Sequence, residues 1–259
     1  MSCWPYPRVL AHRGGGALAP ENTLVAFDVG LGHGYRAVEV DAVLSADEVP
    51  VLLHDATLDR TTNGRGCVDS KTVAELAALD AGSWFHADFA RARIPTLEQA
   101  LHHCLQRGIW LNVEIKPVPG KEARTGQIVA QTIARFWARA AATSVAAPLL
   151  SSFSPIALVA AREAAPQLAR GLLFSKIASD WRNAMQDLGC VSLHCDHRRL
   201  TPGLAQEIRA HGYGLLCYTV NDSRRARTIW NWGVDAICTD RIDRIGPGEY
   251  PGPRQKSTP

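Results

Sequence analysis

The chain of 259 residues is 46% hydrophobic, which is enough apolar material for one large core. Its formal net charge is only +3 and it has no long run of like charges, so we expect a small-molecule substrate and neither a nucleic-acid partner nor a stable membrane association. The seven cysteines include no C-x-x-C pair, which argues against a zinc or thioredoxin-like site and is typical of reduced thiols in a cytoplasmic protein.

The predicted elements begin at about residue 8, which leaves no room for a secretion signal ahead of the first strand. No apolar stretch approaches the roughly 20 residues that a membrane span needs. Strands are expected at residues 8–12, 37–43, 49–53, 110–115, 148–152, 170–174, 191–194, 213–220 and 234–239. Helices are expected at residues 22–33, 72–79, 96–107, 155–165, 178–188, 202–211 and 223–230, with a further helical pattern around residues 128–137.

Short apolar runs and helical patterns alternate to give eight strand–helix units, and repeated units of this kind predict parallel strands. Eight units in this length predict a (β/α)8 TIM barrel as a single domain over residues 1–245, with an open doubly wound sheet as the alternative. Residues of about 55–94 interrupt the rhythm and are predicted to form a small insertion after the second barrel strand. Residues 246–259, rich in Gly, Pro and polar residues, are expected to be a disordered tail.

Alternation along the strands predicts a group of carboxylates inside the barrel. Residues two apart on a strand share a face. The odd-numbered positions from 111 to 115 are apolar, so Asn112, Glu114 and Lys116 face the interior. The same pattern turns Glu39 and Asp41 inward near the end of the second strand. Barrels of this class carry their active sites at the C-terminal ends of the strands, so these side chains are candidate site residues.

Three inward carboxylates repel one another and raise one another's pKa unless a cation lies between them. Carboxylate oxygens suit hard cations, so Glu39, Asp41 and Glu114 are predicted to bind one divalent cation, Mg²⁺ or Ca²⁺. The alternative is that these acids pair only with neighbouring Arg or Lys side chains.

Two histidines, His12 and His54, close strands beside this acidic group. Histidine titrates near neutral pH, so the pair can serve as general acid and general base, although each alone could be structural. Arg13 and Lys116 also stand at strand ends, where they form an anion pocket suited to phosphate or pair with the carboxylates.

Several blocks of this sequence together resemble the glycerophosphodiester phosphodiesterase family. The most specific are HRGGGALAPENTLVAF from His12, EVDAVLSADEVPVLLHDATLDRTTNGRG from Glu39 and LNVEIKP from Leu111. Weaker matches follow in SSFSP from Ser151, YTVN from Tyr218 and GVDAICTD further on. The resemblance covers nearly the whole chain in order and is closest to the compact bacterial cytosolic type.

The resemblance implies a TIM-barrel enzyme that hydrolyses glycerophosphodiesters, such as glycerophosphocholine or glycerophosphoethanolamine, to sn-glycerol 3-phosphate and an alcohol. It implies the following roles: His12 and His54 are the catalytic pair, Glu39, Asp41 and Glu114 are the metal ligands, and Arg13 and Lys116 contact phosphate.

Two further positions are less defined by the resemblance. Asn22 falls in a motif near the site, but it can equally be the N-cap of the following helix. Tyr218 stands where the family often has Trp, and it is expected to form an aromatic wall for the substrate.

Three other functions fit part of the sequence: a lysophospholipase-D-like enzyme acting on lipids, a Schiff-base aldolase that uses Lys116, and a non-catalytic barrel that binds phosphorylated ligands. A Schiff-base lysine needs a lowered pKa, which neighbouring carboxylates oppose. Within the expected activity, either histidine can be the acid, and either water or the glycerol 2-hydroxyl can be the nucleophile. Headgroup preference and oligomeric state are not predicted.

Overall fold

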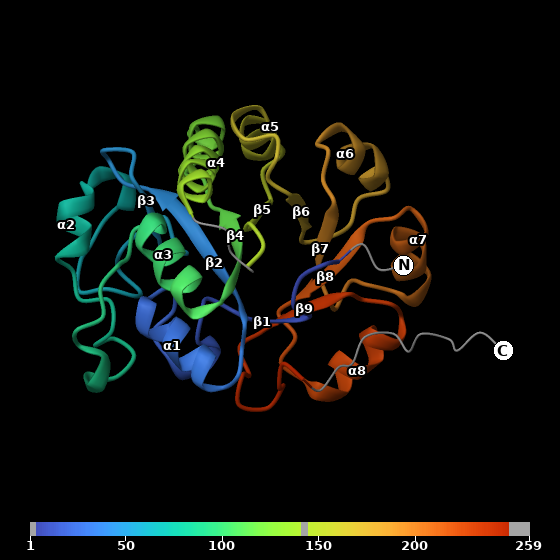
Figure 1. The fold of residues 1–259 in the computed structure, drawn as a ribbon, viewed down its shortest axis with the longest axis horizontal. Coiled ribbons are helices and arrows are strands. Elements are labelled where there is room, and N and C mark those ends of the chain that lie inside the picture. The colour runs from blue at the N-terminus through green and yellow to red at the C-terminus, as the bar shows by residue number, and fades with distance from the viewer. Residues whose placement is uncertain (1–3, 141–144, 249–259) are drawn as a thin grey trace.

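The structure, a computed structural model, describes residues 4–140 and 145–248. Eight parallel strands form a closed ring in the order β1-β9-β8-β7-β6-β5-β4-β2, and β1 pairs with β2 to complete it (Figure 1). The predicted barrel is therefore confirmed, and the alternative prediction of an open doubly wound sheet is wrong. The strands of the ring are β1 (Val9–Ala11), β2 (Ala37–Leu44), β4 (Trp110–Ile115), β5 (Leu149–Ser152), β6 (Arg170–Phe174), β7 (Ser192–Asp196), β8 (Gly214–Tyr218) and β9 (Ala236–Thr239).

Helices follow the strands and surround the ring (Figure 1). Thr96 and Gln99 form a capping box before the helix Leu97–Arg107, and Gly108 ends that helix with a left-handed φ of 65°. After β9 the described residues contain only turns and bends, so the last strand is not followed by a helix there. The helices are α1 (Leu24–Gly32), α3 (Leu97–Arg107), α4 (Glu122–Arg139), α5 (Pro155–Ala164), α6 (Trp181–Asp187), α7 (Pro202–Ala210) and α8 (Ser223–Asn231).

The main core lies between the ring and the helices. Val38 and Val40 of β2 belong to it, as do the odd-numbered residues of β4, so the predicted alternation of the two strands is confirmed. A second apolar cluster fills the interior at the N-terminal ends of the strands, where the rings of Tyr6 and Trp110 stack with centroids 4.2 Å apart. With that end closed, the polar interior residues meet at the C-terminal ends of the strands.

The insertion between β2 and α3 begins with β3 (Pro50–Leu52), which pairs antiparallel with β2. It continues through a short helix, α2 (Val73–Ala77), and two 3-10 turns, η2 (Val68–Ser70) and η3 (Ala87–Phe89). Its apolar side chains, among them Leu58 and Leu76, form a small core of their own with Val43 of β2. The hairpin thus starts a few residues before the predicted limit of about residue 55, and it carries His54 to the mouth of the barrel.

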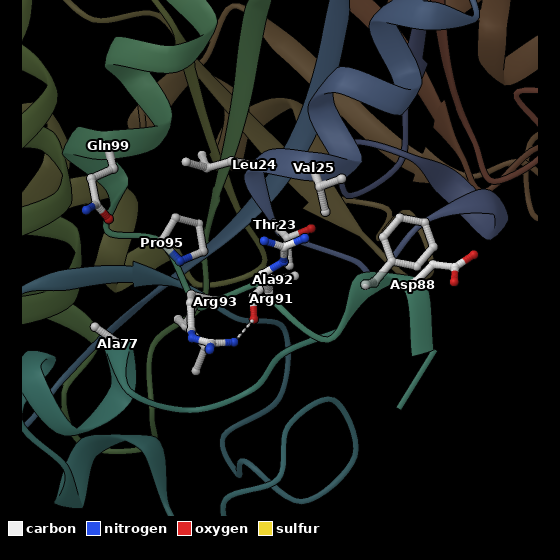
Figure 2. Close-up of a pocket in the computed structure, with 12 residues that line it drawn as sticks. Thr23, Leu24, Val25, Ala77, Asp88, Arg91, Ala92, Arg93, Pro95 and Gln99 are labelled. Carbon is white, nitrogen blue, oxygen red and sulfur yellow. Dashed lines mark hydrogen bonds between the residues drawn. The ribbon is translucent and has the colours of Figure 1, made fainter. Parts of the chain in front are cut away.

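A cavity of about 470 Å³ lies between the insertion and the start of α1 (Figure 2). Asp88, Arg91 and Arg93 are the charged residues among its described lining, and Arg93 donates hydrogen bonds to the backbone carbonyls of Ala90 and Ala92. The rest of the lining is uncharged, so this cavity has no groups for acid–base or metal chemistry like those of the barrel mouth.

None of the described helices combines the length and the apolar character that a membrane crossing requires. The predicted disordered tail lies mostly outside the described residues, because only Gly246, Pro247 and Gly248 of it are included.

The contact between α4 and α5 requires a glycine. A Cβ on Gly126 would lie 2.1 Å from the carbonyl oxygen of Ala157, whereas a Cβ on Gly203 in α7 would meet nothing within 4 Å. We predict that Gly126→Ala lowers the free energy of unfolding by about 1–3 kcal/mol despite the higher helix propensity of Ala. The control Gly203→Ala should leave stability unchanged or raise it by up to about 1 kcal/mol. Denaturant unfolding of both variants measures this, and equal stabilities would contradict the close packing.

Candidate active site

The register of β2 against β4 brings three carboxylates together inside the barrel. Glu39 lies opposite Asn112, and Asp41 lies opposite Glu114. Glu39, Asp41 and Glu114 are 7%, 1% and 8% exposed, and one carboxylate oxygen from each lies within 4.8 Å of the others. The structure therefore assembles the predicted acidic group, with ligand atoms close enough to surround one cation.

The turn after β1 is shaped by residues with positive φ. Arg13 has a φ of 53°, and its backbone N–H donates to Oε2 of Glu39 at 3.3 Å. Gly16 has a φ of 54°, and a Cβ there would lie 2.3 Å from the carbonyl oxygen of Asp240. That carbonyl also accepts a hydrogen bond from the backbone N–H of Ala17 at 2.8 Å. The glycine-rich turn thus packs directly on Asp240, which only a residue without a side chain permits.

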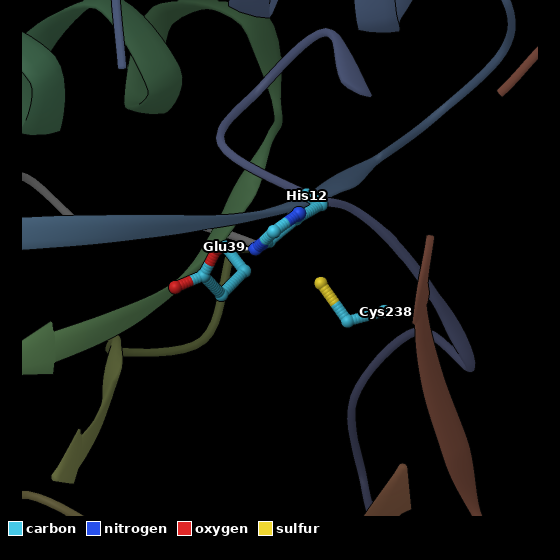
Figure 3. Close-up of side chains that lie close together, drawn as sticks. All are labelled: His12, Glu39 and Cys238. Carbon is cyan, nitrogen blue, oxygen red and sulfur yellow. Dashed lines mark ion pairs between the residues drawn. The ribbon is translucent and has the colours of Figure 1, made fainter. Parts of the chain in front are cut away.

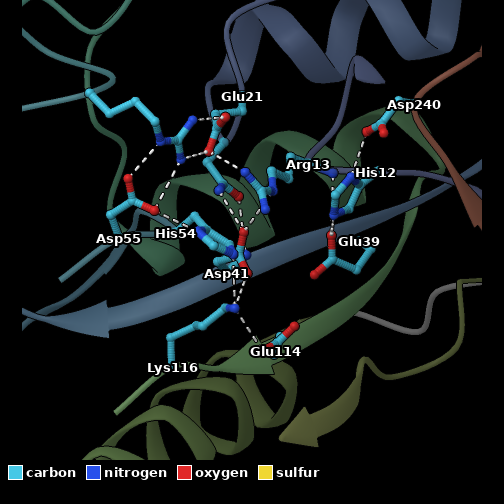
Figure 4. Close-up of polar contacts among 12 residues, drawn as sticks. His12, Arg13, Glu21, Glu39, Asp41, His54, Asp55, Glu114, Lys116 and Asp240 are labelled. Atoms are coloured by element: carbon cyan, nitrogen blue, oxygen red, sulfur yellow. Dashed lines mark hydrogen bonds and ion pairs between the residues drawn. The ribbon is translucent and has the colours of Figure 1, made fainter. Parts of the chain in front are cut away.

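Each predicted catalytic histidine is bonded to an aspartate through Nδ1 (Figure 4). The distance from His12 Nδ1 to Asp240 Oδ1 is 2.6 Å, and that from His54 Nδ1 to Asp55 Oδ1 is also 2.6 Å. In both pairs the carboxylate fixes Nδ1 as the protonated nitrogen and leaves Nε2 for other partners. His12 Nε2 lies 3.8 Å from Glu39 Oε2, and His54 Nε2 lies 3.0 Å from Lys116 Nζ.

The two imidazoles differ in electrostatic environment. Burial alone would lower the pKa of His12, but the hydrogen bond to Asp240 and the charge of Glu39 outweigh burial and raise that pKa above its ordinary value. For His54, burial outweighs the charge of Asp41 and the bond to Asp55, so its pKa falls below the ordinary value. The site thus holds two histidines with different proton affinities.

Arg13 and Lys116 contact the acidic group, as the sequence allowed. Arg13 Nη1 lies 2.6 Å from Glu21 Oε1, and its Nε lies 3.4 Å from Asp41 Oδ2. Lys116 Nζ lies 3.0 Å from Glu114 Oε1 and 3.6 Å from Asp41 Oδ1. The three acids therefore share their space with two cationic side chains, and the pairing expected as an alternative is present.

These two cations do not fully offset the three buried charges. Burial and the neighbouring charge of Asp41 raise the pKa of Glu39 to about 7 and that of Glu114 to about 8. For Asp41, burial is outweighed by Lys116 and Arg13, so its pKa falls below the ordinary value. Near neutral pH the cluster consequently holds protons that a divalent cation would displace.

Asn22 supports Asp41 through both groups of its carboxamide. Its Nδ2 donates to Asp41 Oδ2 at 2.9 Å, and its Oδ1 accepts from the backbone N–H of Asp41 at 3.1 Å. The N-cap of α1 is Thr23, whose hydroxyl accepts from the backbone N–H of Ala26. The alternative reading of Asn22 as the N-cap is therefore wrong. Asn22, with a φ of 59°, lies outside the helix and beside the acidic group.

A salt-bridge chain joins the turn after β1 to the insertion (Figure 4). Arg60 Nε lies 2.6 Å from Asp55 Oδ2, and its Nη1 lies 2.7 Å from Glu21 Oε2. Glu21 in turn pairs with Arg13. Local sequence patterns do not single out Glu21 or Arg60, because their pairing depends on how the insertion folds back over the barrel.

The site surrounds a cavity of about 210 Å³ at the mouth of the barrel. Its lining includes both histidines, the three acids, Arg13 and Lys116. Tyr218 and Phe153 form its aromatic side, with ring centroids 5.9 Å apart. The hydroxyl of Tyr218 donates to the carbonyl of Phe174, so its ring is held in place. Asn112 also lines the cavity, and its Oδ1 has no hydrogen-bond partner within the part of the chain that the structure describes.

Asp240 is the main site residue that was not predicted from the sequence. It follows the last barrel strand directly, in the GVDAICTD segment, and the strand-end argument used for His12 applies to it equally. Its partner could not be known before the ring was closed, because the two residues are 228 positions apart.

The chain is similar in sequence to known phosphodiesterases over most of its length. The profile of the glycerophosphoryl diester phosphodiesterase family matches residues 12–244. A glycerophosphodiester phosphodiesterase of Caldanaerobacter subterraneus is 33% identical over 237 residues, which cover 90% of this chain and 93% of that protein.

Solved structures are similar over the same length. A phosphodiesterase from Oleispira antarctica, in complex with the product sn-glycerol-3-phosphate, is 38% identical with a TM-score of 0.86 and covers 92% of this chain and 95% of its own. A glycerophosphodiester phosphodiesterase from Agrobacterium tumefaciens is 29% identical with a TM-score of 0.75 and covers 92% of this chain and 98% of its own.

A further histidine, His194 of β7, lines the same cavity but is fully buried. Its Nε2 lies 2.9 Å from Ser192 Oγ, and its Nδ1 has no hydrogen-bond partner among residues 4–140 and 145–248. Burial lowers the pKa of His194 to about 3. The imidazole is therefore neutral in the folded protein, and it becomes charged near pH 6.5 only when the chain unfolds.

This difference predicts a pH-dependent stability. The pKa of His194 is lower in the folded chain than in the unfolded chain. The free energy of unfolding therefore decreases as the pH falls from about 6.5 toward 3. The unfolding free energy of the wild type relative to His194→Gln should decrease by about 2–3 kcal/mol between pH 7 and pH 4.5. Denaturant unfolding at both pH values measures the difference. A difference that does not change with pH would show that His194 can be protonated in the folded state.

Proposed function

Because the chain belongs to the glycerophosphoryl diester phosphodiesterase family, we propose that it hydrolyses glycerophosphodiesters to sn-glycerol 3-phosphate and an alcohol such as choline or ethanolamine, with residues 1–245 acting as one catalytic domain. The observation that carries this proposal is the cavity itself. In it, three buried carboxylates and two aspartate-bonded histidines surround one space with an Arg and a Lys. Together these groups could provide charge stabilisation, proton transfer and phosphate binding at one substrate position.

Glu39, Asp41 and Glu114 would hold one divalent cation, Mg²⁺ or Ca²⁺. The residues fit such an ion: their oxygens converge, oxygen ligands are those that both ions prefer, and the raised pKa values of Glu39 and Glu114 reflect a need for positive charge. When bound, the cation supplies Lewis-acid polarisation of a phosphoryl oxygen. Asn112 offers an unused carboxamide oxygen nearby for a substrate hydroxyl or a water molecule.

Arg13 and Lys116 bind the phosphate in this proposal. Arg13 is held from both sides by Glu21 and Asp41, and Lys116 is held by Glu114 and His54, so neither needs to be ordered when substrate arrives. Fixed cations of this kind stabilise the charge that grows on the phosphoryl oxygens in the transition state. A Schiff-base role for Lys116 is not adopted, because Glu114 and Asp41 outweigh burial and raise its pKa above the ordinary value.

His12 and His54 transfer the protons. Each imidazole is oriented by an aspartate at Nδ1, and each Nε2 is directed to groups that line the cavity. One Nε2 takes the proton of the nucleophile, which is water or the glycerol 2-hydroxyl, and the other gives a proton to the leaving alkoxide. Asp240 and Asp55 are positioning residues, which fix the tautomers and stabilise the imidazolium when it forms.

The size of the cavity suits a compact polar substrate. About 210 Å³ is below the 300–1,000 Å³ that is usual for drug-sized ligands, so the glycerol phosphate part fills it. The alcohol then lies toward the opening, beside the rings of Tyr218 and Phe153. We do not adopt a lysophospholipase-D-like activity, because most of the residues that line the cavity are charged or polar.

The proposal is tested by a coupled assay for glycerol 3-phosphate release from several glycerophosphodiesters, with Mg²⁺, Ca²⁺ and Mn²⁺ compared. We predict release with at least one cation and its loss after chelation with EDTA. Glu114→Gln should raise the cation concentration for half-maximal activity at least about tenfold, because one anionic ligand is lost. The control Glu163→Gln changes an exposed residue of α5 and should match the wild type. Activity that survives thorough chelation would remove the metal from the mechanism.

For the histidines, we predict that His12→Ala and His54→Ala each reduce kcat on glycerophosphocholine by at least about 10². The control His102→Ala alters an exposed residue of α3 and should leave kcat unchanged. On a glycerophosphodiester with a nitrophenolate leaving group, the leaving oxygen needs no proton. Only the variant that lacks the general acid should then recover much of the lost rate. Near-wild-type turnover of glycerophosphocholine by either variant would contradict the assignment.

A further inference from the structure

A second group of potential metal ligands lies on the wall of the same cavity. His12, Glu39 and Cys238 come from or directly follow the adjacent strands β1, β2 and β9, and one ligand atom from each lies within 4.8 Å of the other two (Figure 3). Cys238 is 1% exposed, but it lines the cavity, and its Sγ points toward the imidazole of His12 (Figure 3). The group therefore combines a nitrogen, an oxygen and a sulfur ligand on one wall of the cavity.

The imidazole in this group is oriented as a metal ligand would be. Asp240 accepts a hydrogen bond from Nδ1 of His12 at 2.6 Å, so the lone pair of Nε2 faces Glu39 Oε2, 3.8 Å away. Histidines that bind metals almost always have the other ring nitrogen bonded to a carboxylate or carbonyl in this way. The backbone N–H of Arg13 holds the carboxylate of Glu39 in turn, at 3.3 Å from Oε2. Two of the three ligands are thus positioned before any ion arrives.

We propose that His12, Glu39 and Cys238 form a second cation subsite, specific for thiophilic divalent ions such as Zn²⁺, and that an ion bound there inhibits the enzyme. Zinc binds Cys, His and carboxylate together, at about 2.0–2.3 Å and usually in a tetrahedron. Neighbouring ligand atoms are then about 3.5 Å apart, so the side chains need to close by little more than an ångström. Mg²⁺ and Ca²⁺ avoid sulfur, so they prefer the all-oxygen group. On binding, the Cys238 thiol gives its proton to solvent and the thiolate coordinates the ion.

The two cation positions are not independent. Glu39 belongs to both groups of ligands, whereas Asp41 and Glu114 belong only to the all-oxygen group. An ion held by Cys238 therefore competes for Glu39, and it also occupies the Nε2 that His12 needs for proton transfer. The inhibition rests on the function proposed above, but the binding of a thiophilic ion does not.

Binding is tested with Co²⁺ on the metal-depleted full chain, because a thiolate bound to Co²⁺ produces a charge-transfer absorption band that other ligands do not. The band is expected in the wild type and in Cys67→Ser, a control that removes an exposed thiol of the insertion. It should be absent from Cys238→Ser and Cys238→Ala, and addition of Zn²⁺ should abolish it in the wild type. No band in the wild type, or a band that persists in both folded Cys238 variants, would overturn the subsite.

Inhibition is tested by titrating Zn²⁺ into the Mg²⁺-supplied enzyme and scaling each variant to its own zinc-free rate. The Zn²⁺ concentration for half-inhibition should rise at least about tenfold in Cys238→Ser or Cys238→Ala, and not in Cys67→Ser. Equal zinc sensitivity of the wild type and the Cys238 variants would refute the inhibitory role. A cobalt band in a chain that releases no glycerol 3-phosphate would instead refute the proposed function and leave the subsite standing.

Discussion

The parallel register between β2 and β4 is the constraint on which the site depends. It places Glu39 beside Asn112 and Asp41 beside Glu114, all on the interior face, where the three carboxylates are buried. Removing an ionised carboxylate from water costs several kcal/mol unless partners compensate. The surrounding structure supplies those partners as Arg13, Lys116 and the carboxamide of Asn22. A slip of one residue in either strand would turn its acids into the apolar layer under the helices.

Much of this arrangement could be predicted from the sequence, because alternation along a strand is a local property. Alternation placed Glu39, Asp41 and Glu114 inside the barrel without reference to any relative, and the apolar layer outside it is confirmed. The capping box before α3 was predictable for the same reason, since its two residues are only three positions apart. The resemblance of the sequence blocks to a known family then supplied the reaction.

What could not be predicted depends on contacts between distant segments. Asp240 contacts His12 only because β9 pairs with β1, and Arg60 reaches Glu21 only because the insertion folds over the barrel mouth. The N-cap reading of Asn22 was wrong because its neighbour Thr23 caps the helix, which frees the carboxamide of Asn22 for Asp41. Local patterns identify the groups that carry chemistry, whereas partners that are distant in the chain, such as Asp240, can be identified only from the folded structure.

The pairing of β1 with β9 also determines when the active site can assemble during synthesis of the protein. The hydrogen bond from His12 to Asp240 spans 228 residues, and the glycine turn after β1 packs on the backbone of that same aspartate. A ribosome must therefore translate as far as Asp240 before His12 has its partner. Closing so long a loop carries an entropic cost that only the completed barrel repays. A nascent chain that still lacks β9 consequently carries its acids and histidines without the complete site.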